Sequence, residues 1–139
     1  MTVEDSPLPA DRTVVGGMPD AAITVTNRDG SVVCALAGAL HHDNVGQVRR
    51  ALNRALRLQP GVLAVDLSAV DLLTSAGLNA LLTVRREALE RGVRLVVVAP
   101  SRPARHVLRI TQVDTVLPMA PTLEHALRDG GEDPPAREG

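Results

Sequence analysis

The sequence of 139 residues has no Phe, Tyr or Trp, no lysine and only one cysteine. These missing residue types make several classes of function unfavourable. Without aromatic rings it lacks the faces on which nucleic-acid bases stack and the rings that commonly line cofactor pockets. Without lysine it has neither a Schiff-base residue nor a lysine general base. We therefore expect a protein that binds no nucleic acid and no cofactor.

The one cysteine, Cys34, lies in an apolar run over residues 32–36, so we expect a buried thiol and no disulfide within the chain. No signal peptide is visible and no apolar run is long enough to span a membrane, which predicts a cytoplasmic protein without membrane insertion. The net charge of −1 is spread unevenly, because residues 1–20 and 129–139 carry −3 each and leave +5 between them. This surplus weakly favours an acidic protein partner.

The apolar pattern predicts one α/β domain at 21–128, between a disordered leader at 1–20 and a disordered tail at 129–139. We expect a mostly parallel, mixed sheet of about five strands whose first two form a hairpin, in the order β-β-α-β-α-β-α-β-α. Strands are expected at 21–26, 31–37, 62–65, 93–99 and 115–119. Helices are expected from 45 until Pro60, from 75 to about 91, at 101–112, and from 121 to about 128.

Binding sites in open α/β sheets gather after the carboxyl ends of strands, here in the loops expected at 38–44 and 68–74. Ser75 follows the second loop at the start of a helix, and the small side chains after it leave its hydroxyl open to another protein's active site. The free N–H groups and the dipole of the helix would stabilise a phosphate there. In the alternative interpretation, Ser75 or Thr74 is only the N-cap of the helix.

Four segments resemble STAS domains and, more closely, the bacterial anti-sigma factor antagonists. The central segment, residues 65–82, reads VDLSAVDLLTSAGLNALL. It is similar to the family's strand ending in Asp-Leu-Ser, followed by a hydrophobic stretch and by Asp-Ser-Ser/Ala-Gly-Leu at a helix start. The other segments, 36–41, 107–118 and 121–127, follow at the family's order and spacing. The likeness covers about residues 21–128 and implies the STAS fold.

The resemblance also implies a mechanism. Such an antagonist binds an anti-sigma factor, itself a serine kinase with a histidine-kinase-like ATPase fold, and thereby releases a sigma factor. The kinase inactivates the antagonist by phosphorylating the motif serine, which maps onto Ser75, and a serine phosphatase restores it. The expected contact surface consists of residues flanking Ser75 and of the first loop: Thr74, Ala76, Gly77, Leu78, His41, His42 and Asp43.

Two places depart from the family pattern. Thr74 stands where the family has an acid before the serine, and Ala39 and His41 stand where it has Glu and Asp. Because those acids help to form the partner surface, the departures bear on the partner's identity and on phosphorylation. The rest of the motif, Ser75 with Gly77 and Leu78, is retained.

Other chemistry is less favoured. His41, His42 and Asp43 are more simply a surface loop than a metal site, since His106 and His125 fall on separate later helices. No Gly-x-Ser-x-Gly elbow marks a hydrolase, so we expect neither a metal nor an enzyme.

Three alternatives stay open. Asp66 and Asp71 form a candidate carboxylate pair, although Asp66 more simply bonds loop amides. The first helix carries an arginine face that is either solvated or a docking site for an acidic partner: Arg49, Arg50, Arg54 and Arg57. The competing function is a STAS scaffold subunit that does not switch, in a stress-signalling complex or beside a membrane transporter, with a small enzyme as a distant third.

Overall fold

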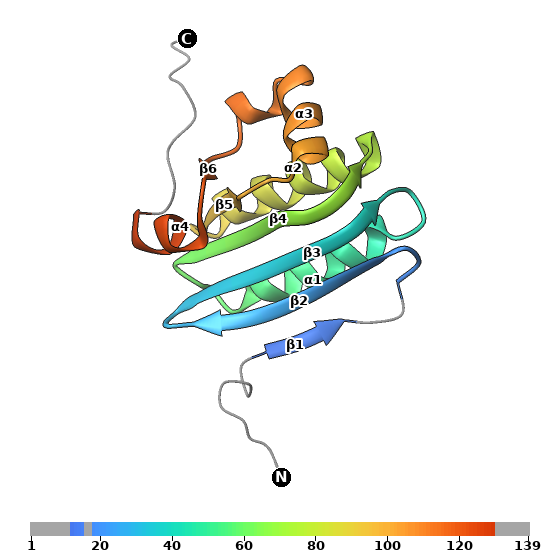
Figure 1. Ribbon diagram of the computed structural model, residues 1–139. Coiled ribbons are helices and arrows are strands. Elements are labelled where there is room, and N and C mark those ends of the chain that lie inside the picture. Colours follow the sequence, from blue (N-terminus) through green and yellow to red (C-terminus); the bar gives the residue numbers. More distant parts are fainter. Residues whose placement is uncertain (1–11, 16–17, 130–139) are drawn as a thin grey trace.

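Figure 1 shows the computed structural model, which describes residues 12–15 and 18–129 of the chain. One six-stranded sheet has the order β1-β2-β3-β4-β5-β6, so each strand lies beside its neighbour in sequence. The strands are β1 (Arg12–Val15), β2 (Ala21–Arg28), β3 (Ser31–Leu40), β4 (Val62–Leu73), β5 (Arg94–Val98) and β6 (Met119–Ala120). The helices are α1 (Val45–Arg57), α2 (Ser75–Glu90), α3 (Arg102–Ile110) and α4 (Leu123–Asp129), with a 3-10 turn, η2, at Val113–Thr115.

The strand directions decide where a site can form. β1, β2 and β3 pair antiparallel, whereas β3, β4, β5 and β6 pair parallel. The carboxyl ends of these four parallel strands therefore meet at one edge of the sheet, which we call the carboxyl edge. The hairpin between β2 and β3 lies at the opposite, amino edge (Figure 1).

The two faces of the sheet are covered unequally. The apolar stripes of α1, α2 and α3 pack on one face with inward strand residues such as Leu36 and Leu67 to form the main core. The other face has a smaller cluster under α4, which includes Ala64 and Val96. Both clusters consist of aliphatic side chains and alanine, with Met18 and Cys34 in the main core, so close packing is reached without rings. Within residues 12–15 and 18–129, no helix combines the length and apolarity that crossing a membrane requires.

The predicted element order is confirmed, and the helix of the central motif begins at Ser75 as expected. β3 and β4 are longer than predicted, however, so residues 38–40 of the first expected loop (38–44) and residues 68–73 of the second (68–74) are strand. Their pairing shifts register between Ala35 and Ala37 and again between Gly38 and Ala39. A bulged strand loses the strict alternation of buried and exposed residues, and this is why the pattern indicated loops.

The N-terminal segment also differs from the prediction of a disordered leader. β1 pairs with β2 from Arg12 opposite Thr26 to Val15 opposite Ile23 and adds an edge strand to the sheet. Met18 is 8% exposed and joins the main core. The remaining leader residues, 1–11 and 16–17, lie outside the described residues.

Near the C-terminus, a last strand follows α3 as expected, but its bounds differ from the predicted 115–119. The 3-10 turn η2 ends at Thr115, and the strand is only the two residues Met119–Ala120. Two residues are too few to show the alternation from which a strand is predicted. The last helix reaches Asp129, and the predicted tail beyond it lies outside the described residues.

Candidate functional site

The ends of β3 and β4 lie side by side at the carboxyl edge. Leu40 and Leu73 form the last pair of their register. The carbonyl oxygen of Leu40 accepts two hydrogen bonds from Thr74, one from its N–H at 3.2 Å and one from its hydroxyl at 2.7 Å. These bonds hold the loop after β3 against the start of α2, so the two regions predicted to form one site are brought together.

Thr74 is the N-cap of α2. Its backbone is extended, with φ −95° and ψ 174°, and its Oγ1 accepts a hydrogen bond from the N–H of Gly77 at 3.4 Å. The same hydroxyl therefore caps the helix and donates to the Leu40 carbonyl. An aspartate at this position would accept from Gly77 but would have no proton to donate to Leu40. Of the two candidate caps, the structure assigns the role to Thr74.

The side chain of Ser75 has no structural role among the described residues. Ser75 is the first residue of α2, its side chain is exposed, and within the described part of the chain its hydroxyl makes no hydrogen bond. The first turn of a helix also presents N–H groups that have no partner inside the helix. A phosphate on this hydroxyl would break no internal contact and would lie at the positive end of the helix dipole.

Two residues expected in the contact surface lie beneath it instead. Gly77 is buried, and a Cβ there would meet Leu73 Cδ1 at 2.8 Å and Leu40 Cβ at 3.1 Å. Leu78 is 6% exposed and belongs to the main core. Neither can reach a partner directly, because α2 lies too close to β3 and β4 at this point. They support the surface, whereas Ala76 is half-buried and remains on it.

The loop after β3 is organised by a buried amide. Asn44 is 0% exposed; its Oδ1 accepts from the N–H of His41 at 3.1 Å, and its Nδ2 donates to the carbonyls of Pro19 and Ala39, each at 2.7 Å. It thereby joins the entry to β2, the end of β3 and the loop itself. The sequence analysis missed this role, since an Asn before a helix indicates an N-cap, yet its side chain makes no capping bond.

His41 is held inside the same loop. Its Nε2 lies 3.0 Å from Asp20 Oδ2, and its Nδ1 accepts a hydrogen bond from the N–H of Asp43 at 3.1 Å. Because Nδ1 accepts, the proton of the neutral ring lies on Nε2, which donates to the Asp20 carboxylate. Both ring nitrogens are therefore engaged, and the exposed residues that form the outside of the loop are His42 and Asp43.

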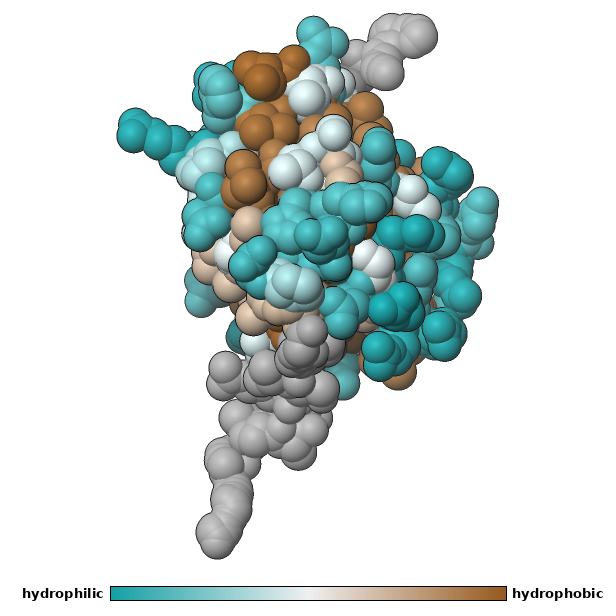
Figure 2. Space-filling model, turned by 90° about the vertical axis from the view of Figure 1, so that its right-hand side faces the viewer, coloured by the Kyte–Doolittle hydropathy of each residue, from teal (hydrophilic) through white to brown (hydrophobic). Residues whose placement is uncertain are grey.

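Leu72 is a surface residue that the sequence analysis did not single out. Its side chain is 48% exposed at the end of β4, two residues before Thr74. Figure 2 faces this edge of the molecule and shows apolar surface in its upper part, where the end of β4 and α3 lie, with polar side chains over most of the rest. Leu72 and Ser75 are thus two exposed side chains that lie close together in the chain, at the carboxyl edge.

The other candidates from the sequence are the metal site, the Asp66 carboxylate and the arginine face of α1. Among the described residues, no group of three or more His, Cys, Asp or Glu side chains could hold a metal ion. Asp66 Oδ1 accepts the N–H of Ser68 at 2.8 Å, as its simpler interpretation predicted. The arginines of α1 are all exposed: Arg49, Arg50, Arg54 and Arg57.

Comparison with known proteins identifies the family. The sequence profile of the STAS domain matches residues 22–126, so the chain belongs to the STAS domain family. The anti-sigma-F factor antagonist RsfB of Mycobacterium tuberculosis is 28% identical over 110 residues, which cover 78% of this chain and 89% of RsfB.

Solved structures of anti-sigma factor antagonists resemble this chain in fold. A crystal structure of an anti-sigma factor antagonist from Mycobacterium paratuberculosis matches with a TM-score of 0.73 and 28% identity, over 80% of this chain and 95% of that one. The anti-sigma factor antagonist SpoIIAA in its unphosphorylated form matches with a TM-score of 0.66 and 23% identity, over 78% and 96%, which is a likeness in fold. The resemblance inferred from the sequence is confirmed.

Proposed function

We propose that this protein is an anti-sigma factor antagonist that works by binding and is switched off by phosphorylation at Ser75. Unphosphorylated, it binds an anti-sigma factor that is also a serine kinase with a histidine-kinase-like ATPase fold, and the sigma factor is released. A serine phosphatase reverses the modification. The class of partner comes from the names of the relatives, RsfB and the Mycobacterium paratuberculosis protein.

One observation supports Ser75 as the switch more than any other. The neighbouring Thr74 caps α2 and bonds β3, whereas the Ser75 hydroxyl is exposed and has no hydrogen-bond partner among the residues that the structure describes. In the competing interpretation, a scaffold that does not switch, Ser75 would be a mere cap, and the capping bond made by Thr74 speaks against that role for Ser75. A hydroxyl without a structural role is free to be modified and restored repeatedly.

A phosphate at Ser75 would act through charge and solvation. It adds a charge of about −1.5 to −2 at neutral pH. The surroundings include the half-exposed Leu72 and the half-buried Ala76, which a partner would cover and dry. Burying a dianion against such a surface is unfavourable unless a cation meets it, so the modified protein would dissociate without any change of fold.

The departures from the family pattern bear on the partner. Thr74 and His41 replace acids of that pattern, and the His41 ring is already hydrogen-bonded to Asp20 and Asp43. The surface around Ser75 thus carries less negative charge than the pattern provides. We expect its cognate kinase to present fewer basic side chains to this surface than the kinases of acidic antagonists do.

The experiment is affinity capture from native cell extract, with Ser75→Ala and Ser75→Glu as parallel baits and Ser68→Glu as a matched control. Ser68 is an exposed serine on β4, so its replacement adds the same charge elsewhere on the surface. The captured kinase is then purified and incubated with ATP and each variant, and the modified residue is located by mass spectrometry.

We expect Ser75→Ala and Ser68→Glu to retain an ATPase-fold kinase and Ser75→Glu to lose it. Phosphate should enter the wild type and Ser68→Glu, and not Ser75→Ala. If Ser75→Glu captures the same kinase as Ser75→Ala, or if Ser75→Ala is still phosphorylated, the switch is refuted and the scaffold function takes its place.

A further inference from the structure

Helix α1 presents an exposed arginine face, which consists of Arg49, Arg50, Arg54 and Arg57. Three of these residues, Arg50, Arg54 and Arg57, are spaced by four and three residues, so their side chains leave the same side of the helix. The helix contains no Asp or Glu. Within the described part of the chain, none of the four guanidinium groups takes part in a hydrogen bond or an ion pair. This face therefore carries four positive charges that no described residue neutralises.

An exposed leucine lies at the end of the arginine face. Leu58 follows Arg57 and is 61% exposed. Both residues lie at the amino edge, because the nearby N–H of Gly61 donates to the carbonyl of Gly30 in the hairpin between β2 and β3, at 2.9 Å. A segment that covered this face would need acids for the arginines and an apolar side chain for Leu58.

The chain contains such a segment in residues 1–11, which precede β1 and which we call the acidic segment. It reads MTVEDSPLPAD and has three acidic side chains, Glu4, Asp5 and Asp11, with no Arg, Lys or His. Its leucine, Leu8, stands between two prolines, a residue type that favours an extended backbone. In charge and in apolar content the acidic segment is therefore complementary to the arginine face and Leu58.

The acidic segment joins the sheet close to the end of α1. Arg12, the first residue of β1, pairs with Thr26, two residues before β2 ends at the hairpin. The strand β1 lies beside β2 at the outside of the sheet (Figure 1), and α1 contacts β2 and β3. The acidic segment therefore meets the sheet at the amino edge, where α1 ends.

The acidic segment is also long enough to follow the arginine face. Glu4 precedes Arg12 by eight residues, which span about 25 Å when extended at about 3.1 Å per residue. From Arg57 back to Arg50 the helix rises about 10.5 Å, at about 1.5 Å per residue. About 14 Å is left for the climb from β1 to the helix, and packed layers of secondary structure lie only about 10 Å apart.

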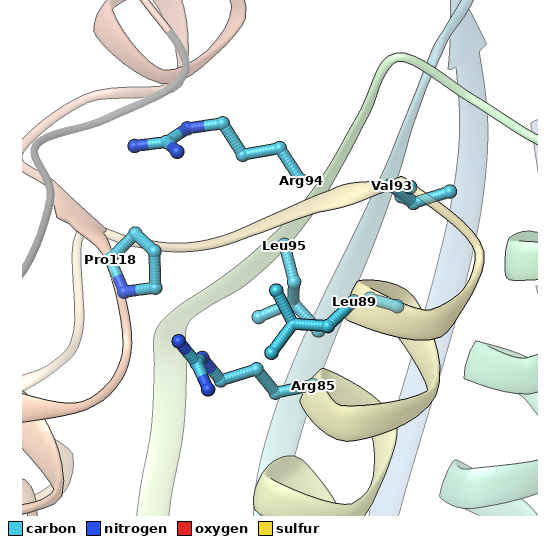
Figure 3. Close-up of a pocket in the computed structure, with 8 residues that line it drawn as sticks. Arg85, Leu89, Val93, Arg94, Leu95 and Pro118 are labelled. Carbon is cyan, nitrogen blue, oxygen red and sulfur yellow. The ribbon is translucent and has the colours of Figure 1, made fainter.

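Other arginines lie farther from the acidic segment. Arg102, Arg105 and Arg109 belong to α3, which packs on β4, three strands away from β1. Arg85 and Arg94 flank the hollow in Figure 3, which is lined by residues of α2 and β5. Arg94 already takes part in another interaction. Among the described helices, α1 thus has the arginine-rich face nearest to the start of β1.

We propose that the acidic segment folds back on α1, with its acids against Arg50, Arg54 and Arg57 and with Leu8 against Leu58. Exposed ion pairs are individually weak, but a tethered segment reaches an effective concentration in the millimolar range at a face this close. The arginine face is then closed to other anionic partners until the acidic segment is displaced. The proposal is independent of the switch at Ser75, which lies at the opposite, carboxyl edge.

The test attaches a nitroxide spin label to Ser6→Cys in the full chain and measures the broadening of backbone amide NMR signals. The one natural thiol, that of Cys34, is buried and should not take the label. A first variant neutralises the acidic segment, and its matched control neutralises three acids near the C-terminus: Glu4→Gln, Asp5→Asn and Asp11→Asn against Glu132→Gln, Asp133→Asn and Glu138→Gln. A second variant removes arginines of α1, and its matched control removes arginines of α3: Arg50→Gln, Arg54→Gln and Arg57→Gln against Arg102→Gln, Arg105→Gln and Arg109→Gln.

At about 0.01 M salt, where the Debye length is about 30 Å, we expect the label to broaden the amide signals of residues 50–58. The broadening should be at least about twofold weaker in the variant with a neutral acidic segment and in the α1 variant, and unchanged in both controls. It should also weaken in about 1 M NaCl, where the Debye length is about 3 Å. The melting temperature of each variant checks that the fold is kept.

A last sample mixes spin-labelled chains with isotope-labelled chains that carry no spin label. We expect no broadening of residues 50–58 in this mixture, because the contact is made within one chain. The proposal is refuted if neutralising the acidic segment leaves the broadening unchanged, or if the α3 variant weakens it as much as the α1 variant. It is equally refuted if the mixture reproduces the broadening, since the acidic segment would then bind a second copy.

Discussion

The two edges of the sheet are held together in different ways. At the carboxyl edge, side chains bonded to backbone add to the backbone–backbone bonds: Asn44 joins three segments, and Thr74 joins α2 to β3. At the amino edge the contacts are mostly backbone to backbone, as in the bond from the N–H of Gly61 to the carbonyl of Gly30 at 2.9 Å. Among its side-chain bonds, those between Gln59 and Arg91 are long and exposed.

This difference has a physical consequence. An edge held by backbone depends on chain conformation and tolerates most changes of side chain. An edge held by side chains depends on particular residues, so substitutions there alter the loops that a partner meets. The surface around Ser75 lies at the second kind of edge, next to a helix cap that does not use Ser75 itself.

Two glycines with nearly the same positive φ give the sharpest test. Gly38 at the carboxyl edge has φ +90°, and a Cβ there would lie 2.3 Å from the Asp20 carbonyl oxygen, whereas Gly30 at the amino edge has φ +87° and open space around it. We expect Gly38→Ala to cost about 3 kcal/mol or more and Gly30→Ala about 1 kcal/mol. Urea unfolding followed by far-UV circular dichroism measures both, and equal losses would show that crowding at the carboxyl edge is unimportant.

Asn44→Asp tests the buried amide. It replaces a group that donates to the carbonyls of Pro19 and Ala39 by one that repels both, so we expect a loss of about 3 kcal/mol in the free energy of unfolding. Asn79→Asp, on the exposed surface of α2, is the control and should stay within about 0.5 kcal/mol of wild type. Similar values for the two variants would mean that Asn44 does not hold the loop.

Gly77→Ala reverses the usual rule for helices. A glycine within a helix is ordinarily improved by alanine, by about 0.5–1 kcal/mol, and Gly46→Ala on α1 should show this gain because the new Cβ would meet only Arg50 Nη1, at 3.8 Å. Gly77→Ala should instead destabilise by about 2 kcal/mol, since Leu73 and Leu40 are in the way. A gain at both positions in urea unfolding would contradict the close approach of α2.

Thr74 and Ser75 are adjacent hydroxyls with opposite expected effects. Thr74→Ala removes the cap and the bond to Leu40 and should cost about 1–2 kcal/mol, whereas Ser75→Ala should stay within about 0.5 kcal/mol of wild type. Thr74→Ser should keep most of the stability. Differential scanning calorimetry of the three variants measures the order of their stabilities. A larger loss from Ser75→Ala than from Thr74→Ala would indicate that Ser75 is the N-cap.

Cys34, midway along β3 between the two edges, should not react with thiol reagents in the folded protein. Burial raises the pKa of its thiol from 9.0 to about 12, so in the folded protein the thiolate is absent at pH 8 and a thiol reagent should not label it until urea unfolds the chain. The pKa is higher folded than unfolded, so the stabilisation from the protonated thiol is present below pH 9 and is lost as the pH rises towards 12. Rapid labelling of the folded protein would contradict this burial.

The sequence predicted the parts of the site that depend on local order. The start of α2 at Ser75 followed from small and hydroxyl residues before a helical pattern, and the adjacency of the two loops followed from parallel strands. It missed Asn44, whose three partners lie up to 25 residues away in the chain. It also placed Gly77 and Leu78 on the surface, because no local pattern says how closely a helix approaches the strands beneath it.

By itself the sequence determined the α/β class, the order of the elements, an aliphatic core without rings, and a serine at a helix start. These follow from hydrophobic periodicity, turn residues and composition, which act over a few residues. Tertiary structure alone decided that Thr74 rather than Ser75 caps α2, because the choice rests on the Leu40 carbonyl, 34 residues earlier in the chain. It also decided that β4 runs on to Leu73 and that α1 ends at the edge where β1 begins, since each depends on which distant segments fold against one another.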